Sequence, residues 1–340
     1  MKLINTRDAV GHVLCHDLTK IVPGQCKGAA FRKGHVVREE DVETLLSMGK
    51  EHLYVWEAGP HMLHEDEAAQ VLRSLCQNEH MAASDPVEGK IDLTAQVDGL
   101  FTVDVEGLRR VNSLGEMMIA TRLSHTPVKK GDKLAGMRVI PLVIEKEKME
   151  RAKAAAGERF LMALHPYQKL QVGVVTTGNE VATGRIQDGF TPVLLDKLKG
   201  YGSEVCWHEL PGDDSQRITE AIRNMIRQGA QMVLCTGGMS VDPDDRTPLA
   251  IKNATDTVIS YGAPVLPGAM FMLAYAGSVP VVGLPGCVMY ARRTIFDLVL
   301  PRILAGLAVT REELAALGHG GLCLHCDPCI FPNCGFGRGV

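Results

Sequence analysis

Residues 231–245 read Gln-Met-Val-Leu-Cys-Thr-Gly-Gly-Met-Ser-Val-Asp-Pro-Asp-Asp, an apolar run that leads into a glycine pair and then into acids. Between residues 170 and 290, three more strand-like runs end at glycine-bearing loops: Thr177-Gly178-Asn179-Glu180, Pro211-Gly212-Asp213-Asp214 and Pro285-Gly286. Helical stretches separate these runs, which is typical of an α/β domain built on a parallel sheet. Because ligands bind at the carboxyl ends of such strands, we expect the loops to share one binding site.

The loops combine two kinds of group that suit a phosphorylated ligand. Glycine lets backbone N–H groups approach an anion closely. Carboxylates beside such a cradle would repel a phosphate unless a divalent cation such as Mg²⁺ lies between them. The alternative reading of each loop is a plain turn in which glycine only relieves backbone strain. The candidate ligand-binding residues are Thr177, Gly178, Asp213, Thr236, Gly237, Gly238, Ser240, Pro285 and Gly286.

The acids of these loops are the candidate catalytic and metal-binding residues. Mg²⁺ takes one or two carboxylates and completes its shell with water and phosphate oxygens, so only some of the acids would serve. We favour Asp245 and Glu180, with Asp213 or Asp214 as a third. Asp214 could instead cap the helix that we expect to begin at Ser215.

The last loop, Pro285-Gly286, precedes a helical pattern that we expect over residues 290–304. The free N–H groups at the start of that helix could bind an anion. A purely structural turn explains the same loop nearly as well.

The end of the chain carries a different signal. Four cysteines follow one another in the order Cys323-x2-Cys326-x2-Cys329-x4-Cys334. Tetrahedral zinc and iron–sulfur clusters both take four thiolates, so this spacing predicts a metal on the tail without deciding between the two. The alternative is a disordered tail with reactive thiols.

Composition limits the other classes of function. A net charge of −4 gives no reason to expect nucleic acid as a partner. The N-terminus lacks the apolar core of a signal peptide, and the longest apolar runs are too short to span a bilayer. We therefore expect a cytoplasmic protein with no membrane contact.

The 340 residues should form several domains. We expect an α/β fold for residues 168–308, preceded by an N-terminal α+β region, a small β-rich module and a charged helical connector, and followed by the cysteine tail. The expected boundaries are 1–80, 85–145, 146–167, 168–308 and 319–340.

Residues 170–306 resemble the molybdopterin-binding domain of the molybdopterin molybdenumtransferase and adenylyltransferase proteins. The Thr177-Gly178-Asn179-Glu180-Val181 segment is similar to the Thr-Gly-Asp-Glu-Leu loop of that family, and Pro211-Gly212-Asp213-Asp214 is similar to its second acidic loop. Gly237-Gly238-Met239-Ser240-Val241 with Asp245 matches its most specific motif. Leu284-Pro285-Gly286 matches its final loop, although Cys287-Val288 stands where the family usually has Asn-Pro.

The resemblance implies a three-layer α/β fold that binds molybdopterin or its adenylylated form, with magnesium as helper, in a homo-oligomer. It implies that Asp245 holds the metal, assisted by Glu180 and by Asp213 or Asp214. It also implies that the Gly237-Gly238 backbone and Ser240 take the phosphate.

Three functions compete under this resemblance. The leading one is a molybdopterin-binding protein of molybdenum cofactor biosynthesis, in its enzymatic form a transferase that inserts metal into adenylylated molybdopterin. Residues 1–150 lack the Asp-Gly-Tyr-Ala segment of the insertase branch, which favours a non-catalytic carrier or sensor whose cysteine tail docks a molybdoenzyme or a biosynthesis partner. The third is a nucleotide pyrophosphatase, because Asp244-Asp245-Arg246-Thr247 resembles the Asp-Asp-x-Thr loop of competence-damage-protein relatives.

Overall fold

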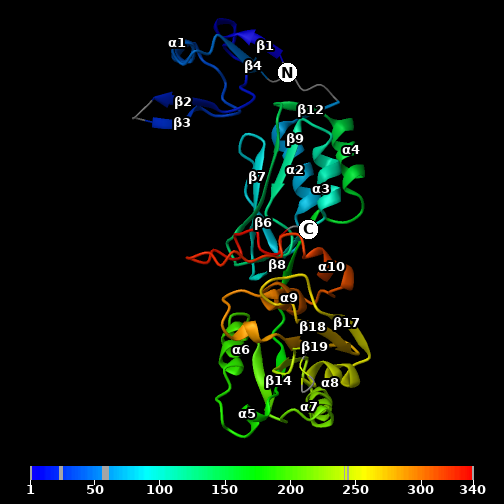
Figure 1. Cartoon of the computed structure of the whole chain (residues 1–340). Helices are drawn as coiled ribbons and strands as arrows, with labels where there is room; N and C mark the ends of the chain where they lie inside the picture. The colour runs from blue at the N-terminus through cyan, green and yellow to red at the C-terminus, as the bar shows by residue number, and fades with distance from the viewer. Residues whose placement is uncertain (1, 23–25, 56–60, 241, 243–244, 339–340) are drawn as a thin grey trace. The chain divides into compact units, whose positions relative to one another are not determined.

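A computed structural model describes the chain except for residues 1, 23–25, 56–60, 241, 243–244 and 339–340 (Figure 1). The chain forms two compact units. The N-terminal unit comprises Met1–Val97, Thr102–Ser124 and Lys130–Leu164, and the C-terminal unit comprises Asp98–Phe101, His125–Lys129 and His165–Val340. The finer division into five regions stays a prediction.

The N-terminal unit mixes short antiparallel sheets with helices. Strand β1 pairs with β4, β2 with β3, and β5 with β12. A four-stranded antiparallel sheet has the order β6-β7-β11-β9, and helix α2 packs against β7 and β11. Its elements are β1 Lys2–Asn5, η1 Thr6–Asp8, β2 Leu18–Val22, β3 Cys26–Phe31, α1 Glu39–Ser47, β4 His52–Val55, β5 Met62–His64, α2 Glu65–Cys76, β6 Met81–Ala83, β7 Lys90–Ala95, α3 Val105–Asn112, β9 Met117–Thr121, β11 Lys133–Val139, β12 Val143–Glu145 and α4 Lys146–Ala156. Three further strands are β8 Gly99–Val103, β10 Thr126–Val128 and β13 Met162–Pro166.

The C-terminal unit is built on a six-stranded sheet of order β15-β14-β16-β19-β18-β17. Strands β15, β14, β16 and β19 are parallel. Strand β18 pairs with β19 in the antiparallel sense, and β17 pairs with β18 in the same way. The α/β fold and the parallel strands predicted from the sequence are thereby confirmed. The elements are β14 Gln171–Thr176, α5 Asn179–Ala182, α6 Phe190–Lys199, β15 Glu204–Glu209, α7 Ser215–Arg227, β16 Met232–Thr236, α8 Thr247–Ala254, β17 Thr257–Tyr261, β18 Met272–Ala276, β19 Val279–Leu284, η2 Gly286–Met289, α9 Ile295–Leu304 and α10 Arg311–Ala316.

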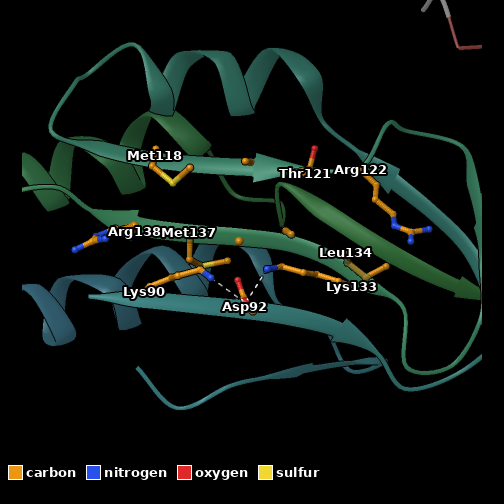
Figure 2. A pocket seen from close by; sticks show the side chains of 12 residues that line it. Lys90, Asp92, Met118, Thr121, Arg122, Lys133, Leu134, Met137 and Arg138 are labelled. Atoms are coloured by element: carbon orange, nitrogen blue, oxygen red, sulfur yellow. Dashed lines mark hydrogen bonds and ion pairs between the residues drawn. The ribbon is translucent and has the colours of Figure 1, made fainter. Parts of the chain in front are cut away.

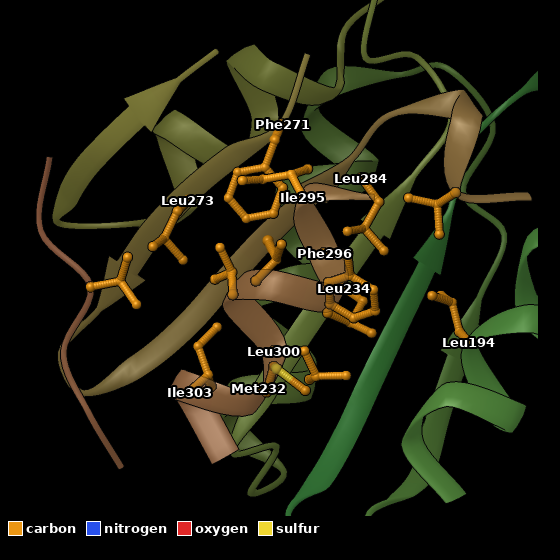
Figure 3. Close-up of a cluster of buried hydrophobic side chains, with 14 of the residues drawn as sticks. Leu194, Met232, Leu234, Phe271, Leu273, Leu284, Ile295, Phe296, Leu300 and Ile303 are labelled. Carbon is orange, nitrogen blue, oxygen red and sulfur yellow. The ribbon is translucent and has the colours of Figure 1, made fainter. Parts of the chain in front are cut away.

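Helices cover both faces of this sheet, which makes three layers. Successive strand residues point to opposite faces, so Leu234 on β16 joins the cluster under α6 and α9, whereas Val233 joins the cluster under α7 and α8. Figure 3 shows Phe296 and Leu300 of α9 close to Leu234 on the first of these faces. The central strands β14, β16 and β19 are apolar along most of their length because both of their faces are buried.

Two features differ from the sequence-based expectation. The sequence predicts a β-rich module over residues 85–145, but this segment also contains helix α3, which Asp104 caps by accepting a hydrogen bond from the Gly107 N–H. The helix expected from Tyr290 begins at Ile295 instead, because Thr294 caps it and Asp297 completes a capping box. A short 3₁₀ turn, η2, occupies the segment before it.

The cysteine tail is folded against the C-terminal unit rather than disordered over its described residues. Leu322 forms a parallel bridge with Leu266, and the Cys323 N–H donates to the Leu266 carbonyl at 2.8 Å. Phe336 is 5% exposed and belongs to the hydrophobic cluster that α9 covers. These contacts hold the twelve residues Cys323–Cys334 as a loop fastened at both ends.

No helix among the described residues is both long and apolar enough to cross a bilayer.

The buried sheet predicts a sharp contrast between two leucines. Leu234 on β16 is fully buried, whereas Leu249 on α8 is 47% exposed. Leu234→Ala should lower the free energy of unfolding by about 2 to 5 kcal/mol because it leaves a cavity between sheet and helix. Leu249→Ala should cost less than about 1 kcal/mol. Urea denaturation followed by Trp207 fluorescence in a Trp56→Phe background measures both, and equal losses would contradict the assigned packing.

Candidate functional site

A hollow of about 400 Å³ lies where β16 and β19 end. The loop after β16 contributes Gly237, Gly238, Met239, Ser240 and Asp245, and the loop after β19 contributes Pro285, Gly286 and Cys287. Its other walls are Phe190, Ala269, Met270, Leu284 and Tyr290. Two of the four loops that the sequence analysis singled out therefore meet at one hollow, at the carboxyl ends of parallel strands.

The glycine pair is required by close backbone packing. Gly237 and Gly238 have φ values of +81° and +54°, in the left-handed region that favours glycine. A Cβ on Gly237 would lie 2.6 Å from the Thr177 carbonyl oxygen, and one on Gly238 would lie 2.8 Å from Thr247 Oγ1. Larger residues would thus push the loop away from the neighbouring segments. Backbone packing therefore determines the shape of this loop.

Thr177 ties the first loop to the third. Its N–H donates to the Thr236 carbonyl at 2.8 Å, and its hydroxyl lies 3.1 Å from both that carbonyl oxygen and Thr247 Oγ1. Thr177 is 3% exposed, so its side chain supports the loop from beneath. The Thr236 hydroxyl is also buried, and it has no hydrogen-bond partner within the described part of the chain.

Asp245 is the acid that lines the hollow. Its Oδ2 accepts a hydrogen bond from the Ser240 N–H at 2.8 Å, which closes the loop across five residues. The Tyr261 hydroxyl donates to the Met239 carbonyl at 3.1 Å and so braces the same loop from β17. Burial, together with the charge of Asp245, raises the pKa of Tyr261. Sequence reasoning missed Tyr261, because nothing in its local pattern distinguishes it from an ordinary strand residue.

The other acids have structural partners. Asp213 Oδ2 accepts from the Asn179 N–H at 2.9 Å, which joins the first and second loops. Asp214 Oδ1 accepts from the N–H groups of Gln216 and Arg217, both at 2.9 Å. Asp214 therefore caps α7, which is the alternative role given for it in the sequence analysis. Glu180 is exposed on the short helix α5. None of these three acids lines the hollow, and their catalytic or metal-binding roles stay predictions.

A further polar cluster stands beside the hollow and was not singled out in the sequence. Asp188 accepts hydrogen bonds from the N–H groups of Phe190 and Thr191 and thereby caps α6. Burial opposes its ionisation, but hydrogen bonds from Thr191, Phe190 and Thr176 outweigh burial and hold the pKa of Asp188 below its usual value. His208 Nε2 lies 3.4 Å from Asp188 Oδ2. The cluster fixes the start of α6, where Phe190 forms a wall of the hollow.

The last loop does not present a helix N-terminus. Residues Gly286–Met289 form a 3₁₀ turn in which the Val288 N–H donates to the Pro285 carbonyl at 3.1 Å. The expected helix start at Tyr290 is therefore wrong, because that helix begins five residues later, whereas anion binding at Pro285-Gly286 stays a prediction. Pro285 and Gly286 still line the hollow, and Tyr290 is 80% exposed at its wall.

The positions of the acidic side chains indicate whether the hollow suits Mg²⁺. Among the described residues, one group brings at least three potential metal-ligand atoms of His, Cys, Asp or Glu within 4.8 Å of one another. It consists of His64, Glu65 and Asp66 and lies in the N-terminal unit. No described trio of loop acids converges in that way. Asp245 alone would face a cation in the hollow, which suits Mg²⁺ because this ion is usually held by one or two carboxylates plus phosphate and water.

Comparison with known proteins agrees with this geometry. Residues 173–305 match the family model described as a probable molybdopterin binding domain. Residues 3–57 match a domain of unknown function. This match covers the segment whose loop motifs resemble that family, and it confirms the resemblance.

Individual relatives cover only parts of the chain. A CinA-like protein of Mycobacterium tuberculosis is 36% identical over 77 residues, which is 23% of this chain and 18% of that protein's length. The molybdopterin biosynthesis enzyme MoaB of Thermus thermophilus is 25% identical, with a TM-score of 0.36, over 40% of this chain and 97% of that one. The tungsten cofactor synthesizing protein MoaB of Pyrococcus furiosus is 23% identical, with a TM-score of 0.31, over 36% of this chain and 84% of that one.

The loop geometry predicts that Gly238→Ala disturbs the site without unfolding the unit. The added Cβ would meet Thr247 Oγ1 in a backbone conformation that L side chains rarely adopt. Amide hydrogen exchange of the residue 236–246 segment should become faster by about tenfold, because local strain of about 1 to 3 kcal/mol favours opening. Gly277→Ala is the control, since Gly277 has φ +57° in a turn with open space around its Cβ position. Equal effects in the 236–246 segment would contradict the close packing described above.

Proposed function

We propose that the C-terminal unit binds the phosphate end of molybdopterin, or of its adenylylated form, in the hollow between the β16 and β19 loops. The observation that carries this proposal is the meeting of the Gly237-Gly238 loop, Asp245 and Pro285-Gly286 around one hollow. The match of residues 173–305 to the model of a probable molybdopterin binding domain supports the ligand class.

Different residues around the hollow would bind different parts of the ligand. The Gly237 and Gly238 backbone and Ser240 would receive the phosphate, since glycine lets N–H groups approach an anion. Mg²⁺, when bound, would offset charge between that phosphate and Asp245. Asp245 Oδ2 accepts from the Ser240 N–H, so Asp245 Oδ1 would be the oxygen that binds the cation. Tyr290, exposed at the wall of the hollow, would offer a ring face to the flat pterin.

The activity proposed for this site is a role in molybdenum cofactor biosynthesis, with transfer of metal into adenylylated molybdopterin as the reaction. Cofactor carriage or sensing without catalysis is the second candidate, favoured by the missing Asp-Gly-Tyr-Ala segment. Pyrophosphatase activity is the third, because Asp244-Asp245-Arg246-Thr247 resembles the Asp-Asp-x-Thr loop of competence-damage-protein relatives and 77 residues of the chain are 36% identical to a CinA-like protein. AMP release on addition of molybdate supports the first, binding without release supports the second, and ADP-ribose turnover supports the third.

Binding should depend on Asp245 only when magnesium is present. In an anaerobic titration with Mg²⁺, Asp245→Asn should weaken molybdopterin binding by about tenfold or more, equivalent to about 1.4 kcal/mol. With EDTA, wild type and variant should bind alike, because the asparagine Oδ1 can still accept from the Ser240 N–H. Asp242→Asn is the control, since Asp242 is exposed on the same loop and does not line the hollow.

An unchanged affinity for Asp245→Asn with Mg²⁺ would contradict the metal role. An equal loss with and without Mg²⁺ would instead show that Asp245 acts by holding the loop. Failure of the wild type to bind either form of the ligand would overturn the proposed function itself.

We also propose that the tail holds a metal through Cys323, Cys326, Cys329 and Cys334. Both ends of the loop are fastened to the C-terminal unit, and an arginine lies beside it: the Arg293 guanidinium carbon is 4.9 Å from the centroid of the Phe331 ring. Three of the four cysteines are partly buried and Cys326 is exposed. The described sulfurs do not include three within 4.8 Å of one another, so binding of a single zinc ion would require the loop to tighten.

Metal analysis of the anaerobically purified full chain tests the tail. Iron with acid-labile sulfide would indicate a cluster, and stoichiometric zinc would indicate a zinc site. Cys326→Ser should lose most of the metal, whereas Cys206→Ser, an exposed cysteine on β15, should retain it. Absence of both metals from the wild type, or equal retention in both variants, would overturn this part of the proposal.

A further inference from the structure

The N-terminal unit carries a hollow of about 560 Å³ on the open face of its four-stranded sheet, and no part of the proposed function uses it. Figure 2 shows that its side chains come from three neighbouring strands, β7, β11 and β9. The opposite face of the sheet is buried, with Ile91, Leu93, Ile119 and Met137 almost fully covered.

Strand register explains why the sheet is hollow at this point. Gly136 of β11 pairs with Ala120 of β9 on one side and with Asp92 of β7 on the other. Two small residues next to each other leave the middle of the face without side chains. Two residues after Gly136 on β11, Arg138 pairs with Met118 of β9 and with Lys90 of β7. Longer side chains therefore form a wall beside a flat floor.

The walls are cationic. Lys90, Arg122, Lys133 and Arg138 line the hollow, and Asp92 is the acid among its lining residues. Asp92 Oδ2 forms ion pairs with both lysines, at 2.7 Å from Lys133 Nζ and 3.2 Å from Lys90 Nζ. The Arg122 guanidinium reaches Asp132 at 3.3 Å. A net positive charge remains around the floor.

The register itself places like charges together. Lys90 and Arg138 stand directly opposite each other on adjacent antiparallel strands. Like charges in that position destabilise a sheet unless an anion lies between them. The Arg138 side chain makes no hydrogen bond or ion pair with any residue in the described part of the chain, although its charge favours ionisation of the buried Glu65.

Asp92 provides a second sign of a ligand. Its Oδ1 is buried and has no hydrogen-bond partner among the described residues. Gly136 creates the space that Oδ1 occupies, because a Cβ there would lie 2.9 Å from that oxygen. A buried carboxylate oxygen without a donor is costly, and a ligand hydroxyl or amine at the floor of the hollow would satisfy it.

We propose that this sheet face is a binding site for a small organic oxyanion that carries at least two negative charges. The charged groups would lie against Arg138, Lys90 and Arg122, and a hydroxyl or amine of the same molecule would donate to Asp92 Oδ1. Phosphate and carboxylate groups share the chemistry that guanidinium and ammonium groups recognise. A volume of about 560 Å³ is within the range of small-molecule sites.

Calorimetric titration of the full chain at low salt tests the proposal with inorganic pyrophosphate and with citrate as probes. Saturable binding of one molecule per chain is expected for at least one of them, with pyrophosphate preferred if the natural anion is a phosphate and citrate preferred if it is a carboxylate. Arg138→Gln should weaken binding by about tenfold through loss of a charged contact. Ala120→Leu should weaken it to a similar extent by filling the floor without changing the charge.

Arg109→Gln is the matched control, because Arg109 is an exposed arginine on α3 of the same unit and does not line the hollow. It should leave the affinity unchanged. Circular dichroism melting of each variant shows whether the unit remains folded. Lack of saturable binding of both probes would overturn the proposal, and so would an equal loss in Arg109→Gln or no loss in folded Ala120→Leu, since these results would indicate a diffuse charge effect.

Discussion

The C-terminal unit depends on the close approach of two strand ends, where the Thr177 N–H donates to the Thr236 carbonyl and Gly237 packs directly on the Thr177 backbone. This contact brings the loops after β14 and β16 together and turns the second loop sharply enough for Asp245 to close it on Ser240. Glycine is required at both positions of the pair because any Cβ would meet Thr177 or Thr247. The hollow is therefore a consequence of backbone packing between parallel strands.

The same packing explains why acids gather at this edge although only Asp245 among the candidate acids lines the hollow. Asp213 and Asp214 satisfy backbone N–H groups of the first loop and of α7, and Asp188 satisfies those of α6. Strand and helix ends leave unpaired N–H groups, and carboxylates are good acceptors for them. Asp245 combines both roles, since one oxygen holds the loop and its carboxylate faces the hollow. An acidic loop composition thus does not by itself identify metal ligands, because such acids also accept hydrogen bonds from backbone N–H groups.

Much of this unit could be predicted from the sequence, because its strands are apolar runs that end at glycine and its motifs are local. The glycine-bearing loops after β16 and β19 and the place of Asp245 follow from such signals, whereas the loops after β14 and β15, expected at the same site, do not line the hollow. Tyr261, Asp188 and His208 could not be found in the same way, since their importance comes from pairing between segments far apart in the chain. The start of α9 at Ile295 was missed because the apolar pattern continues upstream, whereas the Thr294 cap decides the boundary. In the N-terminal unit, the cationic hollow depends on the register of β7, β11 and β9, which composition does not reveal.

The central claim is that the β16 and β19 loops form the molybdopterin site. Backbone amide chemical shifts of the isotopically labelled full chain, recorded anaerobically as molybdopterin is added with Mg²⁺, test it most directly. The account predicts saturable shifts that are largest at Gly237, Gly238, Ser240 and Gly286. Shifts confined to other parts of the chain, with these four amides unmoved at saturation, would contradict it.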